Sequence, residues 1–458
     1  MAQKPTIPKG TRDFSPQEVT RRNHIMDILR RNFELFGFQP IETPSFENTD
    51  TLMGKYGEEG DRLIFKILNS GDFLRKVKPE LYADEDSSTL GPAITEKALR
   101  YDLTVPFARY VVQHQNELEF PFKRYQMQLV WRADRPQKGR FREFLQCDAD
   151  VVGSDSLTQE IDFVQLYDAV FTELKLAGTT IKINNRKILS GIAEVIGAAD
   201  QLIDFTVALD KLDKIGENGV VKEMLGKGIS ENAVDTLRPI FRASGSNTEK
   251  LNVLKELLSN SKIGLEGISE IEYVLDKTEN LGLKTASVAL DITLARGLNY
   301  YTGAIIEVSA PEGVSMGSIG GGGRYADLTG IFGLKNMSGV GISFGVDRIY
   351  LVMEELSLFP ERATTGAQVL FINFGEKESM YCLKAVKLLR EQNIRAELYP
   401  DAAKMKKQMT HADRRDINFV VLAGTKEMTD ETYALKNMKT GDQEQVNMEQ
   451  LIERLNNS

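Results

Sequence analysis

The segment from Lys123 to Val152 constrains the fold of this 458-residue chain more than any other part of its sequence. Apolar and polar residues alternate at its two ends, over 123–132 and 143–152, as they do in strands with one buried face. We therefore predict two antiparallel strands. The loop between them, residues 133–142, is far longer than a hairpin turn needs, and long loops held by rigid strands are often binding loops.

Alternation divides the second strand into two faces. One face is apolar and carries Leu145, Cys147, Ala149 and Val151. The opposite face carries Phe144, Gln146, Asp148 and Asp150, and the first strand adds Gln126, Gln128 and Arg132. A solvated face with incidental charges is the alternative. A ring, amides, carboxylates and an arginine on one shared surface favour a binding site.

The charge of the chain is distributed unevenly. Its formal net charge is −9, which argues mildly against a nucleic-acid partner. Between Pro121 and Arg142, however, one acidic residue, Asp134, stands among seven basic ones. These are Lys123, Arg124, Arg132, Arg135, Lys138, Arg140 and Arg142. A local excess of six positive charges can attract phosphate groups.

Bulk composition indicates a globular protein of two or three domains, with 41% hydrophobic and 27% charged residues. No apolar run is long enough to span a bilayer, and the first residues do not form a secretion signal. The two cysteines, Cys147 and Cys382, and three histidines leave little for a disulfide framework or a zinc site. We expect a cytoplasmic protein with no membrane association and no zinc.

Three further segments suggest a family. Residues 131–144 resemble motif 2 of class II aminoacyl-tRNA synthetases, in its histidyl form. Residues 341–349 resemble motif 3, a strand, a glycine turn and a helix that carries Arg348. The amphipathic segment from Ser15 to Gly37, with a capping box at Ser15 and Glu18, resembles motif 1. Its apolar stripe suits a core or a subunit interface, and motif 1 implies a homodimer.

Two peptides are similar to the signatures of histidyl enzymes, residues 294–303 and residues 320–325. Each peptide has a simpler interpretation. The first could be an ordinary strand and turn with glycines at its bends, and the second a flexible glycine loop. Asn299 and Ala326 stand where aspartates are more usual. The segment from Arg100 to Pro106 matches the form of the family with an aspartate before the threonine.

The resemblance implies an α+β fold with an antiparallel catalytic sheet. Residues 1–194 and 286–360 would form the catalytic core, and residues 195–285, which are helical and poor in aromatics, a helical insertion domain. Residues 366–458 show a βαβ-like pattern and resemble an α/β anticodon-binding domain. That tail carries fourteen basic and fourteen acidic residues. Its cluster of basic residues is either RNA-facing or a solvated helix face, and comprises Lys404, Lys406, Lys407, Arg414 and Arg415.

The implied activity is activation of L-histidine by ATP with Mg²⁺, followed by transfer to tRNA(His). In-line displacement at phosphorus needs positioning and positive charge rather than a protein nucleophile. The implied catalytic residues are Arg132 and Arg296. The implied ATP ligands are Arg132, Asp134, Phe144 and Arg348. The implied histidine ligands are Asp102, Thr104, Gln146, Asp150, Arg296, Tyr300, Tyr301 and Tyr325. The implied tRNA contacts are Arg135, Gln137 and Arg140.

Three other functions fit these motifs less well. A regulatory paralogue of the synthetase fold typically lacks the anticodon domain and the histidine peptides, and both are present here. A tRNA-sensing module without catalysis has no need of Arg132, Arg296 and Arg348 together. Proline and threonine enzymes are disfavoured by the peptide from Arg296 to Tyr301.

Overall fold

The computed structural model describes residues 4–75, 77–83, 86–296, 301–326, 328–360 and 366–457. The chain divides into two compact units, residues 1–360 and residues 361–458. No helix among the described residues is long and apolar enough to cross a membrane.

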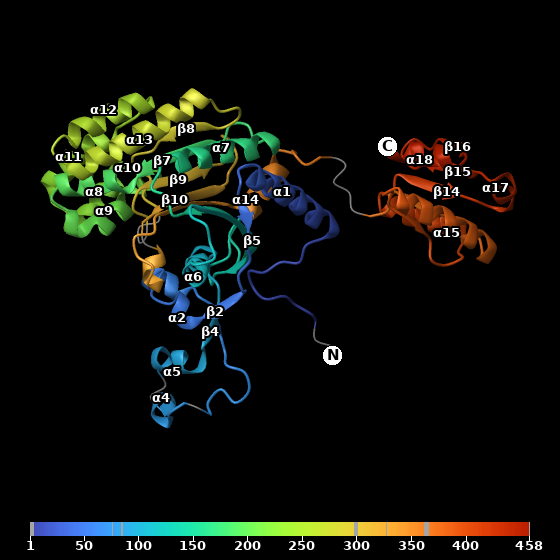
Figure 1. The fold of residues 1–458 in the computed structure, drawn as a ribbon, viewed down its shortest axis with the longest axis horizontal. Coiled ribbons are helices and arrows are strands. Elements are labelled where there is room, and N and C mark those ends of the chain that lie inside the picture. The colour runs from blue at the N-terminus through green and yellow to red at the C-terminus, as the bar shows by residue number, and fades with distance from the viewer. Residues whose placement is uncertain are drawn as a thin grey trace. The chain divides into compact units, whose positions relative to one another are not determined.

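A large mixed sheet organises the first unit (Figure 1). In spatial order its strands are β1 (Gln39–Pro40), β5 (Phe122–Trp131), β6 (Glu143–Val152), β11 (Gly339–Phe344), β10 (Gly320–Tyr325), β9 (Ala304–Ser309), β7 (Thr180–Asn185) and β8 (Ser287–Leu290). Neighbouring strands are antiparallel except at the two edges, where β1 joins β5 and β7 joins β8 in parallel. The fold is therefore α+β, as predicted.

Helices α1 (Pro16–Leu35), α7 (Thr158–Glu173) and α14 (Val346–Glu355) share one apolar core with the sheet. The predicted capping box begins α1, where Ser15 and Glu18 satisfy each other's backbone N–H groups. The apolar stripe of α1 lies in this core, where Ile25, Leu29 and Phe33 are 0% exposed. Because these side chains are used inside the protein, they are not available to a subunit interface.

The predicted strand pair is confirmed, with β5 and β6 antiparallel from Phe122 opposite Val152 to Trp131 opposite Glu143. Cys147, Ala149 and Val151 are buried in the core under the helices. The polar residues of β6 consequently occupy the other face of the sheet. One face of this sheet thus supplies the hydrophobic core and the other is left for polar chemistry.

The helical region follows α8 (Arg186–Val195) along the chain. It comprises η1 (Ala199–Gln201), α9 (Leu202–Leu209), α10 (Leu212–Gly226), α11 (Glu231–Phe241), α12 (Asn247–Leu257) and α13 (Lys262–Leu281). Its apolar residues form one core cluster with residues of α8, β7 and β9. The assignment of residues 195–285 to a domain of their own stays a prediction.

A second, smaller sheet lies between β1 and β5 in sequence. It contains the strands β2 (Phe46–Asn48), β4 (Lys97–Leu99) and β3 (Lys66–Ile67). Short helices accompany them, namely α2 (Thr49–Leu52), α3 (Gly57–Arg62), α4 (Pro79–Ala83) and α5 (Ser87–Ile94), and α6 (Thr104–His114) follows. Apolar periodicity is weak in such short helices, and α5 is instead begun by the Asp86 carboxylate, which accepts from the Ser88 N–H at 2.9 Å.

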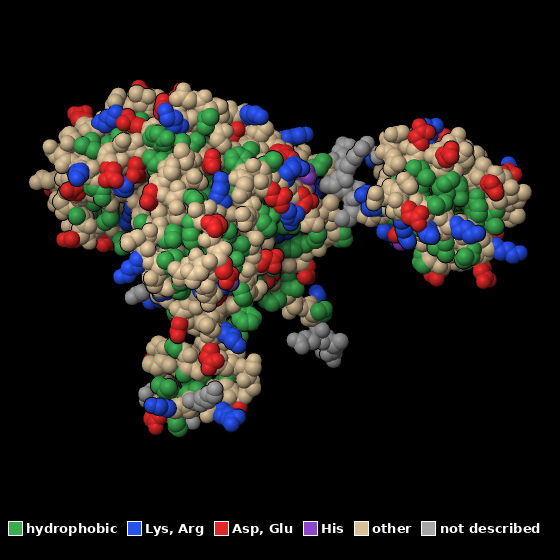
Figure 2. All heavy atoms as spheres, in the orientation of Figure 1, with side chains coloured by type: hydrophobic (Ala, Val, Ile, Leu, Met, Phe, Trp, Pro, Cys, Tyr) green, Lys and Arg blue, Asp and Glu red, His purple; other side chains and the backbone are tan. Residues whose placement is uncertain are grey.

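The C-terminal unit contains a five-stranded mixed sheet. Its spatial order is β13 (Ala396–Leu398), β12 (Val369–Phe371), β14 (Phe419–Leu422), β15 (Tyr433–Asn437) and β16 (Gln443–Val446). The helices are α15 (Glu376–Glu391), α16 (Met405–Arg414), α17 (Thr425–Asp430) and α18 (Met448–Asn456). The predicted βαβ pattern is present, since β12 and β14 are parallel and α15 lies between them in sequence. Figure 2 shows hydrophobic side chains on the surface of this unit, and Met380 and Leu383 of α15 are exposed.

Candidate active site

The polar face of the large sheet is built by its strand register. Ser343 of β11 pairs with Asp148 of β6, Gly321 of β10 pairs with Ser343, and Glu307 of β9 pairs with Gly321. Gln126 of β5 completes the row opposite Asp148. Residues from five strands, distant in sequence, therefore lie in one line across the open face of the sheet.

Two cavities adjoin on this face. The larger has a volume of about 420 Å³ and the smaller of about 180 Å³. Both are lined by Arg132, Gln146, Tyr301, Gly321, Gly322 and Ser343. A ligand that reaches from one cavity into the other would therefore pass Arg132 and Gln146.

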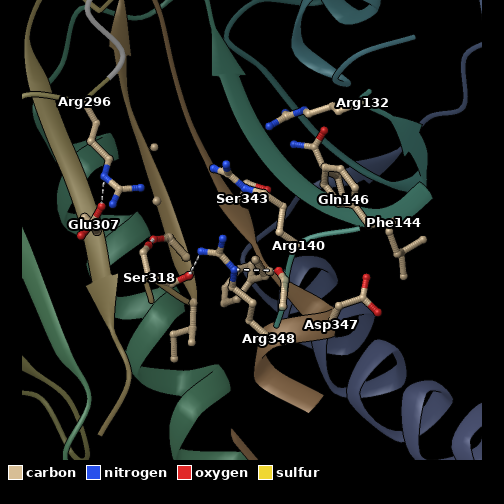
Figure 3. Close-up of a pocket in the computed structure, with 18 of the residues that line it drawn as sticks. Arg132, Arg140, Phe144, Gln146, Arg296, Glu307, Ser318, Ser343, Asp347 and Arg348 are labelled. Carbon is tan, nitrogen blue, oxygen red and sulfur yellow. Dashed lines mark hydrogen bonds and ion pairs between the residues drawn. The ribbon is translucent and has the colours of Figure 1, made fainter. Parts of the chain in front are cut away.

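Four arginines surround the larger cavity (Figure 3): Arg132, Arg140, Arg296 and Arg348. Arg348 is held by two backbone oxygens, since its Nε donates to the Gly139 carbonyl at 3.1 Å and its Nη1 to the Ser318 carbonyl at 2.6 Å. Burial, together with the positive charges of nearby arginines, lowers the pKa of Arg348. Such a concentration of cations favours a polyanionic ligand.

Arg132 and Arg296 approach the cavity from different walls. Arg132 donates through Nε to the Tyr101 carbonyl at 3.0 Å, and its guanidinium carbon lies 4.3 Å from the centre of the Tyr101 ring. Arg296 forms an ion pair with Glu307, whose carboxyl has its pKa raised by burial. Each arginine is thereby oriented by a neighbour, which limits the side-chain entropy that a ligand would have to remove.

The smaller cavity is lined by three buried carboxyl groups, those of Asp102, Asp148 and Asp150. The Tyr325 hydroxyl donates to Asp150 Oδ1 at 2.8 Å, and Arg124 forms an ion pair with Asp150 Oδ2 at 2.7 Å. The Tyr56 hydroxyl donates to Asp102 at 2.8 Å. Arg124 is 0% exposed and is the one buried cation at this cluster in the described residues.

Burial raises the pKa of all three carboxyl groups. For Asp148 the pKa reaches about 7, because desolvation, with repulsion from Asp150 and Asp102, outweighs the attraction of Arg124. Desolvation also raises the pKa of Asp102 and Asp150, against the opposing effects of hydrogen bonds and of nearby arginines. A cationic or hydrogen-donating ligand would relieve this excess of buried negative charge.

Glycines make room for the polar side chains of the smaller cavity. A Cβ atom on Gly341 would lie 2.0 Å from Asp150 Oδ1, and one on Gly323 would lie 2.9 Å from the Tyr301 ring. The glycine run of residues 320–323 is therefore a central strand rather than a flexible loop. Its backbone, without side chains, lets Tyr301 lie against the sheet.

The structure brings most of the predicted site residues to these two cavities. The larger is lined by Arg132, Asp134, Phe144, Arg296 and Arg348. The smaller is lined by Asp102, Thr104, Gln146, Asp150, Tyr301 and Tyr325. Tyr300 lies outside the described residues.

The three loop residues predicted to contact tRNA differ in position. Arg135 and Gln137 are exposed and line neither cavity. Arg140 lines the larger cavity, and its Nη1 lies 3.8 Å from Asp134 Oδ1. Its place there makes it a candidate nucleotide contact as well as a candidate tRNA contact.

Three residues of the site, Arg124, Asp148 and Glu307, were not predicted from the sequence to have a role in it. Arg124 was counted in the basic patch, but it is buried against Asp150, and Lys123 pairs with Asp162. The patch is thus smaller at the surface than predicted. Asp148 was placed on the correct face without a role, and Glu307 was not identified. Arg124 stands two residues before Gln126 in β5, so strand alternation puts both side chains on one face; this pattern could have identified Arg124.

Among the described residues, no group of three or more His, Cys, Asp and Glu side chains is arranged so that it could hold a metal ion. Three acidic residues line the larger cavity, but Asp347 is paired with Arg12 and Arg22, and Glu307 with Arg296. A divalent cation would therefore depend on the oxygens of a bound polyphosphate.

Comparison with known proteins decides the family. The family model described as Histidyl-tRNA synthetase matches residues 95–349, and the one described as Anticodon binding domain matches residues 368–458. A histidine–tRNA ligase of Christiangramia forsetii is 69% identical over 443 residues, which cover 97% of each chain. One of Flavobacterium johnsoniae is 64% identical and covers 99% of this chain and 100% of the relative. The chain belongs to the histidyl-tRNA synthetase family.

Solved structures agree with this family assignment. A histidyl-tRNA synthetase from Nostoc sp. PCC 7120 matches over 100% of both chains with a TM-score of 0.83 and 31% sequence identity. A protein from Bacillus halodurans, described as an ATP phosphoribosyltransferase regulatory subunit/histidyl-tRNA synthetase, shares the fold at a TM-score of 0.69 and 19% identity, over 90% of this chain and 97% of that one. Fold alone therefore does not separate synthetases from regulatory relatives, and the side chains of the site must do so.

Proposed function

We propose that this protein is a histidine–tRNA ligase, which joins histidine to ATP as histidyl-adenylate and then transfers the histidyl group to tRNA(His). The observation that carries the proposal is the pair of adjoining cavities, one rich in arginine and one rich in carboxyl groups. An amino acid and ATP require this combination, because a triphosphate is anionic and an amino group is cationic.

The larger cavity is the proposed ATP site. Phe144 and Arg348 both line it and suit the two faces of an adenine ring, since an aromatic ring and a planar guanidinium both stack on bases. Arg140 and Asp134, both in the loop of residues 133–142, line the same cavity. Magnesium would supply charge neutralisation on the phosphates when bound.

The smaller cavity is the proposed histidine site. Asp102, Thr104 and Gln146 offer oxygens to the α-amino group. Asp150, oriented by Arg124 and Tyr325, offers a carboxylate to one imidazole N–H, and Tyr301 lies in the same wall. A carboxylate and phenols can engage a ring that both donates and accepts hydrogen bonds.

The reaction takes place where the cavities meet. The carboxylate oxygen of histidine attacks the α-phosphorus, the new P–O bond forms, and the bond to pyrophosphate breaks. Arg132 lines both cavities and can hold the carboxylate and the α-phosphate together, while Arg296 approaches from the opposite wall. Preorganised cations at this point stabilise the charge that develops in the transition state.

Transfer to tRNA involves further parts of the chain. Arg135 and Gln137, exposed on the loop beside the ATP cavity, are proposed to contact the acceptor end together with Arg140. The C-terminal unit is proposed to bind the anticodon. We propose a homodimer located in the cytoplasm, where charged tRNA is used. The interface must involve surfaces other than the buried stripe of α1.

The experiment that tests the proposal is pyrophosphate exchange with each of the twenty amino acids. Exchange should require ATP with magnesium and should be stimulated by histidine alone. Equal or faster exchange with proline or threonine would contradict the histidine assignment. No exchange with any amino acid, from a folded protein, would favour a regulatory relative instead.

A further inference from the structure

A segment near the N-terminus lies against the loop of residues 133–142, which forms one wall of the ATP cavity. We infer that this segment, residues 8–14, braces the loop, and that Arg12 is a positioning residue for ATP binding. The inference rests on the proposed function only for the identity of the nucleotide. The brace itself depends on contacts of the described residues.

Backbone contacts join the segment to the loop. The Gly10 carbonyl accepts from the Arg142 N–H at 2.9 Å, and the Arg142 guanidinium also donates to the Asp134 carbonyl at 3.2 Å. Gly10 has φ +87°, and a Cβ there would lie 2.8 Å from Arg142 and 2.9 Å from Pro136. Only glycine allows the segment to lie this close to the loop without strain.

Arg12 links the loop to α14. Its guanidinium carbon lies 3.2 Å from the centre of the Phe141 ring, and the same group forms an ion pair with Asp347 at 2.7 Å. Phe141 and Asp347 both line the ATP cavity. One side chain therefore joins two walls of the cavity from outside it.

The loop is also held from the other side. Arg348, the next residue after Asp347, donates to the carbonyl of Gly139 at 3.1 Å. The loop is thus fixed at Gly139 by a residue that itself is a proposed ATP ligand, and at Phe141 by Arg12. Without Arg12, ATP would have to order the loop as it binds. The entropy that the loop loses would make the free energy of ATP binding less favourable. Histidine binds in the other cavity and would not bear this cost.

The test compares Arg12→Ala with Arg21→Ala. Arg21 is a matched control because it too joins α14 through an ion pair, to Glu354 at 3.1 Å, and its guanidinium carbon lies 5.0 Å from the centre of an aromatic ring, that of Phe359. Neither of these partners lines the cavity. In histidine-dependent pyrophosphate exchange, Arg12→Ala should raise the KM for ATP about tenfold and leave the KM for histidine within twofold. Arg21→Ala should change neither.

A second measurement does not depend on activity. Lys138 and Arg140 are exposed trypsin sites within the loop, so cleavage after them, followed by mass spectrometry, reports how firmly the loop is held. Arg12→Ala should accelerate this cleavage about tenfold, and Arg12→Lys, which keeps the charge without the planar stack, should lie between it and the parent. If Arg12→Ala does not fold, Gly10→Ala tests the same brace, because its Cβ would push the segment from the loop.

The outcomes separate the two proposals. Unchanged cleavage and unchanged KM for ATP in folded Arg12→Ala would overturn the brace. An equal rise of both KM values would also overturn it, because it would indicate a general structural defect. If the parent protein shows no histidine-dependent exchange while Arg12→Ala still accelerates cleavage, the brace stands and the proposed enzymatic function fails.

Discussion

The replacement Asp150→Asn is the sharpest test of the histidine site. Asp150 is 3% exposed, accepts from the Tyr325 hydroxyl at 2.8 Å and pairs with Arg124 at 2.7 Å. Asparagine preserves the shape of the side chain and removes its charge. A hydrogen bond to a charged group contributes about 1.5–3 kcal/mol, so the KM for histidine should rise by a factor of roughly 10–150. The KM for ATP should stay within twofold of the parent value.

The same replacement should lower stability, because it removes the carboxylate that faces the fully buried Arg124. Breaking a buried pair by removing one partner costs about 3–5 kcal/mol. The actual loss should be at the lower end, since Asp148 also attracts Arg124. Urea unfolding measures this loss of stability. The kinetics must be measured without denaturant, at a temperature at which the variant is folded.

Asp168→Asn is the matched control for this experiment. Asp168 is equally buried, at 4% exposed, but it accepts from three backbone N–H groups, those of Lys284, Thr285 and Ala286, each at 2.8 Å. Its replacement should reduce stability with no change in either KM. The reasoning would be refuted if Asp150→Asn left the KM for histidine within twofold, or raised both KM values by one common factor.

Three other predictions concern separate parts of the molecule. Arg132→Ala should raise the activation barrier of adenylate formation, measured in the pre-steady state, by about 2.7–4 kcal/mol. Lys138 is exposed, and its replacement by alanine should leave this barrier unchanged. A rate for Arg132→Ala within threefold of the parent would show that Arg132 is not a catalytic group. Burial raises the pKa of Asp148 from 3.8 to about 7, so the native state retains a proton that the unfolded chain releases. The free energy of unfolding should therefore fall as pH rises from 5 to 8, and urea titrations should show a smaller fall for Asp148→Asn. An identical pH dependence in the two proteins would contradict the pKa shift. A chain that ends at Pro360 should still exchange pyrophosphate but lose tRNA charging, because the proposed ATP and histidine ligands all precede this point; equal loss of both would show that the C-terminal unit supports the active site.

Much of the fold could be predicted from local pattern. Alternation in β5 and β6 predicted both strands to within a residue and the correct buried face, because a half-buried strand must alternate whatever its neighbours are. The capping box predicted the start of α1, because its hydrogen bonds form within four consecutive residues. Motif order identified the family without any knowledge of three-dimensional contacts.

Tertiary structure decided what depends on pairing between distant segments. From sequence alone, the glycine run of β10 could be a flexible loop, because glycines show no alternation of apolar and polar side chains. Its pairing with β9 and β11 makes it a strand. The sequence alone leaves Arg124 in a basic patch, whereas the strand register places it opposite Asp150. The sequence also leaves the stripe of α1 as either core or interface, and packing with α7 and α14 makes it core. Burial and pKa are properties of the assembled environment, so the sequence identified which groups could act, and folding determined which of them lie in the site and in what charge state.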